Sequence, residues 1–162
     1  MTISASPVTP DSFGQLLASV TGTLVSRPLD RQLEQALNRD FPAAGPDYQA
    51  IFHSCQAAIT AGWMCNREAG GIKFGRVIKP GPATHGFSID VVDMQPMAGP
   101  HHAHPNGEID LIMPLEPGAA FDGRGAGWLV YGPGSAHSPT VTGGRARVLY
   151  LLPGGAIEFT RG

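Results

Sequence analysis

The first third of the chain carries hydrophobic residues at helical spacing. Apolar positions recur at intervals of three and four residues in three stretches, and two of these follow Pro28 and Pro46. Ser12 and Gln15 have the spacing of a capping box at the start of the first stretch. The pattern predicts three helices whose apolar stripes must be covered by the rest of the chain or by a second subunit. These stripes are Phe13, Leu16, Leu17 and Val20; Leu29, Leu33, Ala36 and Leu37; and Tyr48, Ile51, Phe52, Cys55, Ile59 and Trp63.

Beyond Gly70 the pattern changes to short alternating runs separated by glycine and proline. The chain has 22 glycines and 15 prolines, and they are concentrated in this part. Seven or eight short antiparallel strands with such turns are typical of a sandwich or barrel. We therefore expect a mainly β protein, with an N-terminal helical segment at residues 1–68 and a β-barrel domain at residues 69–162. The predicted strands are 72–78, 87–94, 108–113, 119–121, 128–131, 139–141 and 147–152.

Composition excludes several classes of partner. The formal net charge is −2 and only 15% of the residues are charged, which argues against a nucleic acid or an anionic membrane. No apolar run approaches the roughly eighteen residues of a membrane span, and the N-terminus lacks the pattern of a signal peptide. Cys55 and Cys65, if both lie on the third helix, are about 15 Å apart, too far for a disulfide. These features predict a cytoplasmic protein.

Four residues in the barrel domain have the spacing of a metal site. His102 and His104 alternate on a strand and therefore share a face. Asn106-Gly107 favours a tight turn that brings Glu108 back opposite the two imidazoles. His137 follows a Pro/Gly turn about thirty residues later. Three neutral imidazoles and one carboxylate suit a divalent transition metal ion such as Fe, Mn, Ni, Co or Zn.

Two other histidines are excluded from this set. His53 lies in a helical pattern far upstream, and a lone histidine is seldom a ligand. His101 has the opposite strand parity from His102, so we expect it to face solvent or to support a ligand.

The two histidine motifs resemble those of the cupin family, which pair a glycine, His-x-His and Glu with a later turn ending in His. The resemblance implies a double-stranded β-helix, or jelly-roll barrel, with His102, His104, Glu108 and His137 as metal ligands, and it implies a homodimer. The chain departs from the pattern in detail. Gly99 is closer to His102 than usual, and Val141 replaces the asparagine expected after the last histidine.

Two further residues are candidates for chemistry. If Glu108 faces the barrel interior, Asp110 does so too, where it could orient a ligand or move protons; otherwise it ends a strand in water. Arg76 shares one face of a predicted strand with Ile72, Phe74 and Ile78, and the apolar residues predict that this face is the interior one. A buried guanidinium needs an anionic partner. That partner is either the carboxylate of a substrate or an internal Asp or Glu.

The core of the chain more closely resembles the 4-hydroxylaminobenzoate lyases. The resemblance rests on four runs, Lys73–Pro82, His85–Ser88, His104–Met113 and Pro133–His137. It implies conversion of 4-hydroxylaminobenzoate and water to 3,4-dihydroxybenzoate and ammonia, with the metal ion as Lewis acid on the N–OH oxygen. It also implies that Asp110 or Glu108 handles protons and that Arg76 holds the substrate carboxylate. No nicotinamide or flavin is expected, since no Gly-x-Gly-x-x-Gly unit is present.

Other functions use the same ligand types. An Fe(II) dioxygenase that cleaves a ring or oxidises a thiol, a metal-dependent isomerase of a sugar or keto acid, and a non-catalytic small-molecule-binding cupin all remain open at this stage. Oxygen uptake during turnover would favour the dioxygenase, whereas anaerobic release of ammonia would favour the lyase.

Overall fold

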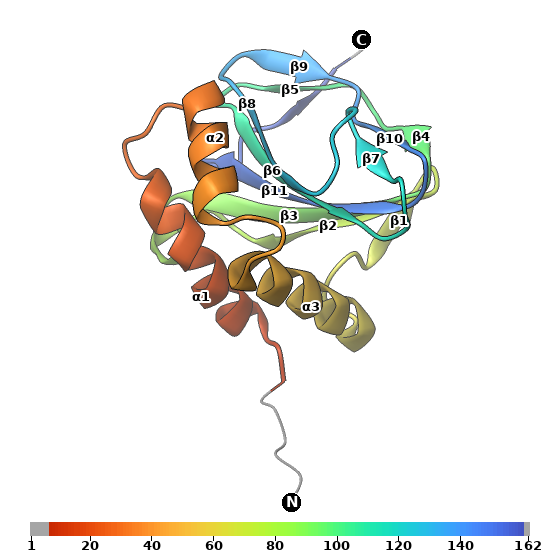
Figure 1. Cartoon of the computed structure of the whole chain (residues 1–162), viewed down its shortest axis with the longest axis horizontal. Coiled ribbons are helices and arrows are strands. Elements are labelled where there is room, and N and C mark those ends of the chain that lie inside the picture. Colours follow the sequence, from red (N-terminus) through yellow and green to blue (C-terminus); the bar gives the residue numbers. More distant parts are fainter. Residues whose placement is uncertain (1–6, 161–162) are drawn as a thin grey trace, which may run out of the picture.

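Three α-helices form in the three predicted stretches (Figure 1), although Leu29 lies before the second helix and Trp63 beyond the third, so their predicted places on these helices were wrong. The computed structural model describes residues 7–160, so residues 1–6 of the predicted helical segment lie outside the described part. The helices are α1 (Pro10–Thr21), α2 (Arg31–Asp40) and α3 (Pro46–Ala61), with short 3-10 turns η1 (Gly22–Leu24) and η2 (Pro82–Thr84). The capping box of α1 is real but begins three residues earlier than predicted. Thr9 is its N-cap and accepts from the backbone of Ser12, whose hydroxyl accepts from Thr9.

Twelve β-strands are found between residues 7 and 160. Their bounds are β1 (Arg67–Ala69), β2 (Ile72–Ile78), β3 (Phe87–Met94), β4 (Met97–Ala98), β5 (His102–His104), β6 (Glu108–Pro114), β7 (Ala120–Phe121), β8 (Gly127–Tyr131), β9 (Ser135–His137), β10 (Thr140–Thr142), β11 (Ala146–Pro153) and β12 (Glu158–Phe159). The seven predicted strands match β2, β3, β6, β7, β8, β10 and β11 to within one residue at each end. The additional strands are only two or three residues long.

The strands form a barrel of antiparallel sheets. A six-stranded sheet, in the order β1-β2-β3-β11-β6-β8, makes one wall. Two three-stranded sheets, β4-β10-β7 and β12-β5-β9, lie across the interior from it (Figure 1). Neighbours such as β3, β11 and β6 are far apart in the sequence, as in a jelly roll. The prediction of a mainly β jelly-roll barrel with an N-terminal helical segment is therefore confirmed.

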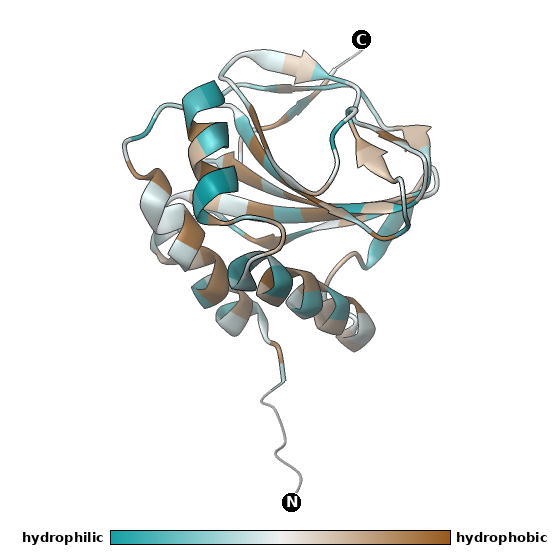
Figure 2. Cartoon of the chain, in the orientation of Figure 1, coloured by the Kyte–Doolittle hydropathy of each residue, from teal (hydrophilic) through white to brown (hydrophobic). Residues whose placement is uncertain are grey.

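The large sheet has two apolar faces. On β6, Ile109, Leu111 and Met113 pack with the helices, whereas Ile112 packs inside the barrel. Figure 2 shows hydrophobic residues recurring along α1 and α3, and Phe13, Leu17 and Ile51 of these helices belong to the same core cluster as the sheet residues. The barrel itself therefore covers the apolar stripes of these helices. The predicted division at residue 69 falls inside β1, and both parts of the chain contribute to this helix-side core.

A bulge in β2 changes the predicted alternation. Arg76 pairs with Asp90 and Ile78 with Ile89, so one residue is inserted between the two pairs. Such an insertion reverses the faces of the residues that follow it. Ile72 and Phe74 pack in the barrel interior as predicted, but Ile78 packs on the helix side. The prediction that Ile78 shares the interior face was wrong for this reason.

Helix α2 covers an exposed edge of the large sheet. β8 is the last strand of that sheet, so its outer backbone groups have no strand partner. The Asn38 amide donates to the carbonyl of Trp128 (2.9 Å) and accepts from its N–H (2.8 Å). The Glu34 carboxylate accepts from the N–H of Val130 (2.9 Å). Two side chains of α2 thus replace the hydrogen bonds of a missing strand.

We expect Asn38→Ala to lower the free energy of unfolding by about 1–3 kcal/mol, because it leaves a backbone donor and acceptor of Trp128 without partners. Urea unfolding followed by circular dichroism measures the change. Gln35→Ala removes an exposed amide from the same helix and serves as the control. An equal loss in the two variants would contradict this role for Asn38.

Both cysteines are free and buried. Cys65 lies beyond the end of α3 at Ala61, so its predicted place on that helix was wrong, although the prediction that no disulfide forms is confirmed. Burial raises the pKa of both thiols to about 12, so they remain protonated at neutral pH.

No helix within residues 7–160 combines the length and hydrophobicity needed to cross a membrane.

Candidate metal centre

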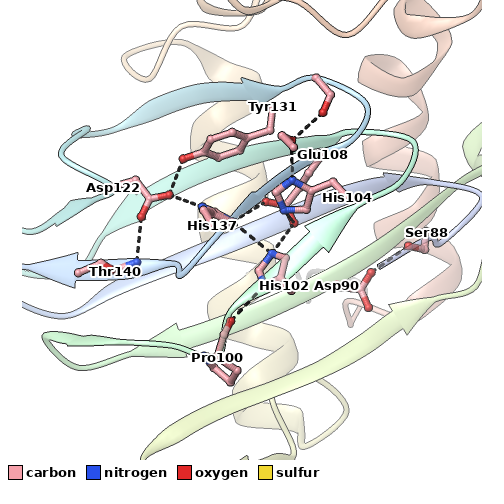
Figure 3. A network of polar contacts seen from close by, with 12 residues as sticks. Ser88, Asp90, Pro100, His102, His104, Glu108, Asp122, Tyr131, His137 and Thr140 are labelled. Carbon is pink, nitrogen blue, oxygen red and sulfur yellow. Dashed lines mark hydrogen bonds and ion pairs between the residues drawn. The ribbon is translucent and has the colours of Figure 1, made fainter. Parts of the chain in front are cut away.

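The structure brings His102, His104, Glu108 and His137 together inside the barrel (Figure 3). β5 and β9 pair so that His102 lies opposite His137, and their Nε2 atoms are 3.2 Å apart. Glu108, on β6, places Oε1 at 3.4 Å from Nε2 of His102 and 3.2 Å from Nε2 of His104. Its Oε2 lies 3.6 Å from Nε2 of His137. Three strands from two sheets therefore aim four donor groups at one point.

A tight turn places Glu108 in this group. The N–H of Gly107 donates to the carbonyl of His104 (3.1 Å), and Gly107 has a φ of +89°. A Cβ at this position would lie 2.8 Å from the carbonyl oxygen of Tyr131, so only glycine fits. β5 pairs with β9 and β12, whereas β6 pairs with β11 and β8. The turn therefore passes the chain from one sheet to another and is not the tip of a hairpin.

Hydrogen bonds fix the protons of the three imidazoles. The Ser135 hydroxyl donates to the Gly132 carbonyl (2.6 Å) and so accepts from Nδ1 of His104 (2.9 Å). Nδ1 of His137 donates to the Asp122 carboxylate (2.6 Å), and Nδ1 of His102 faces the Pro100 carbonyl at 3.4 Å. With its proton on Nδ1, each neutral ring presents the lone pair of Nε2 to the centre.

The donor set fits a divalent metal ion. Nε2 of His104 and both oxygens of Glu108 are buried and have no hydrogen-bond partner among the described residues. Lone pairs that face one another in this way need a positive charge between them. Bonds of about 2.1 Å to one ion place neighbouring ligand atoms about 3.0–3.4 Å apart. The four separations given above, 3.2–3.6 Å, are close to that range, and all the ligand atoms lie within 4.8 Å of one another.

The electrostatics of the cluster also favour a cation. Burial opposes ionisation of Glu108, but the surrounding imidazoles hold the pKa of its carboxyl well below the usual value. Burial would lower the pKa of His137, yet its hydrogen bond to Asp122 and the negative charge of the nearby Glu108 raise that pKa to about 9. The carboxylates therefore stabilise positive charge at Nε2 of His137, whether a proton or a metal ion carries it.

Asp110 lies beside Glu108 on the interior face of β6. Its side chain is fully buried, and neither of its oxygens has a hydrogen-bond partner within residues 7–160. Burial, followed by the negative charge of Glu108, raises the pKa of Asp110 well above the usual value for an aspartic acid. Burial and the charge of Glu108 therefore both favour the protonated form of Asp110 in this structure.

Asp122 is a residue of this centre that was missed at the sequence level. Asp122 accepts from His137 and also from the Tyr131 hydroxyl (2.5 Å) and the N–H of Thr140 (2.9 Å) (Figure 3). Asp122-Gly123 signals only a turn in the sequence, and nothing in its spacing from His137 indicates contact. The pairing of β10 with β7 brings the two together.

We expect Asp122→Asn to weaken metal binding by about 10–100-fold, because an amide cannot stabilise the His137 imidazole as a carboxylate does. Competition against a chelator of known affinity measures the change. Asp40→Asn alters an exposed carboxylate far from the centre in sequence and is the control. Unchanged affinity in Asp122→Asn would show that this hydrogen bond does not tune the centre.

A groove leads from the cluster across the large sheet. The part beside His102 is apolar and has a volume of about 190 Å³. The part beside Arg76 and Asp90 has a volume of about 280 Å³. The two parts form one groove because they share five lining residues, Phe74, Val92, Tyr150, Ile157 and Phe159.

Arg76 lies at the far end of this groove and has an internal partner. Its Nε donates to Asp90 (2.9 Å) and its Nη2 to the carbonyl of Gly155 (2.9 Å). The side chain is 35% exposed, so it lies at the rim and not in the sealed interior. Nη1 makes no hydrogen bond to any residue between 7 and 160. Asp90 is thus the internal carboxylate that the sequence left open, and the guanidinium still has N–H groups to donate.

The two histidines that the sequence excluded, His53 and His101, lie outside the cluster. His53 is exposed on α3. His101 faces away from the ligands on β5, and its Nδ1 contacts the Thr160 hydroxyl next to β12. This contact joins His101 to the residue that follows β12.

The jelly-roll barrel, with His-x-His and Glu on one side and His137 on the paired strand, defines a cupin. The chain belongs to the PnbB family of 4-hydroxylaminobenzoate lyases, whose family model matches residues 15–159. A 4-hydroxylaminobenzoate lyase from Nocardioides sp. (strain LMS-CY) is 32% identical over 145 residues, which cover 84% of this chain and 86% of that protein. One from Pseudomonas putida is 31% identical over 144 residues, covering 78% and 82%.

Solved structures with related architecture are more distant in sequence. An oxalate oxidase is 22% identical, covers 57% of each chain and gives a TM-score of 0.45. A Klebsiella pneumoniae protein with a double-stranded β-helix domain is 17% identical, with a TM-score of 0.45, and the match covers 63% of this chain and 94% of that one.

Proposed function

We propose that this protein is a metal-dependent 4-hydroxylaminobenzoate lyase that converts 4-hydroxylaminobenzoate and water to 3,4-dihydroxybenzoate and ammonia. Family membership and two relatives with this name support the substrate. The observation that carries the proposal is the convergence of three imidazole lone pairs and the Glu108 carboxylate beside an apolar groove that His102 lines. A cavity of about 150 Å³ accepts a benzene ring, so the apolar part of this groove is large enough for one.

The reaction balances without an outside oxidant. One molecule of substrate and one of water together contain the atoms of one 3,4-dihydroxybenzoate and one ammonia. The N–O bond breaks with its electron pair leaving on oxygen, and the ring takes up the oxygen of water at the carbon next to the one that bears nitrogen. Hydrolysis of the resulting iminium carbon releases ammonia, and loss of a ring proton restores the aromatic ring. The nitrogen is reduced as the ring is oxidised, so we expect no nicotinamide or flavin.

The residues of the centre have distinct proposed roles. His102, His104, Glu108 and His137 would hold the divalent ion, which would supply Lewis acidity toward the N–OH oxygen. Asp110, a buried carboxylic acid, gives its proton to the hydroxyl that leaves and takes one back from the water that adds. Glu108 lies two residues from Asp110 on the same strand and is the second group through which this proton can pass.

The other end of the groove is proposed to hold the substrate carboxylate. Arg76 has unused N–H groups there, and a guanidinium binds a carboxylate in its own plane. Phe74 and Tyr150 line the path between Arg76 and the metal centre. A flat ring with a carboxylate at one end and a hydroxylamino group at the other matches this order of groups.

An anaerobic assay tests the function. Protein stripped with a chelator and reloaded with one divalent ion at a time is expected to release ammonia and 3,4-dihydroxybenzoate in equal amounts without oxygen. The stripped protein is expected to be inactive. A strict need for oxygen, with oxygen atoms from O₂ in the product, would replace the lyase with the dioxygenase alternative.

A further inference from the structure

The three tyrosines of the chain use their hydroxyl groups differently. Tyr48 donates to the carbonyl of Ile112 (3.2 Å), and Tyr131 donates to Asp122 (2.5 Å). Tyr150 is 5% exposed, and its hydroxyl makes no hydrogen bond to any residue between 7 and 160, but this oxygen is not among the buried atoms that lack a partner, so it is open to the groove. Buried tyrosines usually pair their hydroxyl, because an unpaired one costs free energy. A hydrogen-bond partner for the Tyr150 hydroxyl can therefore come from a molecule bound in the groove that its ring lines.

Tyr150 lies midway along this groove. On the large sheet it is the direct neighbour of Asp90 on one side and of Asp110 on the other. Arg76 pairs with Asp90 one strand further out. The Tyr150 ring centroid is 6.4 Å from that of His102, and the side chain borders both the part of the groove at the metal centre and the part at Arg76. A ligand that reaches from Arg76 to the cluster must pass over this residue.

We propose that the Tyr150 hydroxyl positions the water that adds to the substrate ring and then binds the new hydroxyl of the product. This inference rests on the proposed function. With the carboxylate at Arg76 and the nitrogen at the cluster, the carbon that takes up water is meta to the carboxylate and lies on the part of the ring between them. Among the five residues that line both parts of the groove, Tyr150 has the polar side chain, and its hydroxyl has no hydrogen-bond partner among the described residues.

The phenol is suited to hold water but not to remove its proton. Burial, followed by the negative charges of Glu108 and Asp110, raises the pKa of Tyr150 well above its usual value. The hydroxyl therefore keeps its hydrogen and can donate one bond and accept another. Proton removal remains with Asp110, and Tyr150 acts by orientation.

Binding of two stable ligands tests this role without turnover. 3-Hydroxybenzoate carries the ring hydroxyl at the position where water adds, and benzoate lacks it. Calorimetry on the metal-loaded protein is expected to give about tenfold tighter binding of 3-hydroxybenzoate by the wild type, the value of one good hydrogen bond. Tyr150→Phe should reduce this preference to less than about threefold. Tyr48→Phe removes a phenol that has an internal partner outside the groove and should keep the preference.

Kinetics supply a second readout. Tyr150→Phe is expected to lower kcat by about 10–100-fold while KM changes by less than about threefold, because the lost contact is made to water and not to the bound substrate. Metal content should equal that of the wild type. A tenfold preference retained in Tyr150→Phe would overturn the inference and leave the lyase function intact. Failure of both benzoates to bind the wild type would overturn the proposed aromatic carboxylate substrate, and this inference with it.

Discussion

His104→Ala is expected to lose most of the bound divalent ion and more than about a hundredfold in kcat/KM for 4-hydroxylaminobenzoate. Loss of a residue that only supports a ligand already costs about 10–100-fold, so loss of a ligand must cost more. His104 is fully buried, and its Nδ1 is held by Ser135 so that Nε2 faces Glu108. Elemental analysis of protein purified without added metal, together with steady-state kinetics, measures both effects.

His101→Ala is the matched control for this prediction. His101 is adjacent to the ligands in sequence but contacts Thr160 on the other side of β5. The His101→Ala variant should therefore retain the bound divalent ion. Both variants should keep the far-ultraviolet circular dichroism of the wild type, because neither side chain belongs to the helix-side core. Full turnover by His104→Ala in the presence of chelator would show that the ion has no part in the reaction.

Local patterns predicted most of the architecture and the four proposed ligands. Strand alternation depends on neighbours two residues apart, so the bounds of the longer strands could be found without knowledge of the fold. The same rule placed Glu108, Asp110 and Ile112 on one face of β6, as the structure has them. His102 and His104 share a face for the same reason.

What the sequence did not indicate depends on contacts between distant segments. Asp122 meets His137, and Tyr150 lies between Asp90 and Asp110, only because of the order in which strands pair. The bulge after Arg76 also has no local signature, and it moved Ile78 to the other face. The hydrogen bonds from side chains of α2 to the backbone of β8 also join distant segments, and the sequence did not indicate them either. The homodimer and the cytoplasmic location stay predictions.

Arg76 has two competing carboxylate partners, Asp90 and the proposed substrate. Arg76→Ala is expected to raise the activation free energy for 4-hydroxylaminobenzoate by about 2–3 kcal/mol, near the lower end for a hydrogen-bonded charged pair because the side chain is at the rim. Arg76→Lys should recover only part of the loss, since an ammonium lacks the planar fork. Phenylhydroxylamine, which has no carboxylate, should be a poor substrate for the wild type and lose little more on mutation. Comparison of kcat/KM for the two substrates isolates the contact to the carboxylate.

Asp90→Asn separates the two partners of Arg76. The amide can still accept from Nε of Arg76, but it leaves the guanidinium charge without its internal carboxylate. If Arg76 binds the substrate carboxylate, Asp90→Asn should keep or lower KM for 4-hydroxylaminobenzoate, because the competing negative charge is gone. If Arg76 serves only to pair with Asp90, Asp90→Asn and Arg76→Ala should lose activity alike, and both substrates should suffer equally. That result would assign Arg76 to the stability of the barrel rim and require another group for the carboxylate.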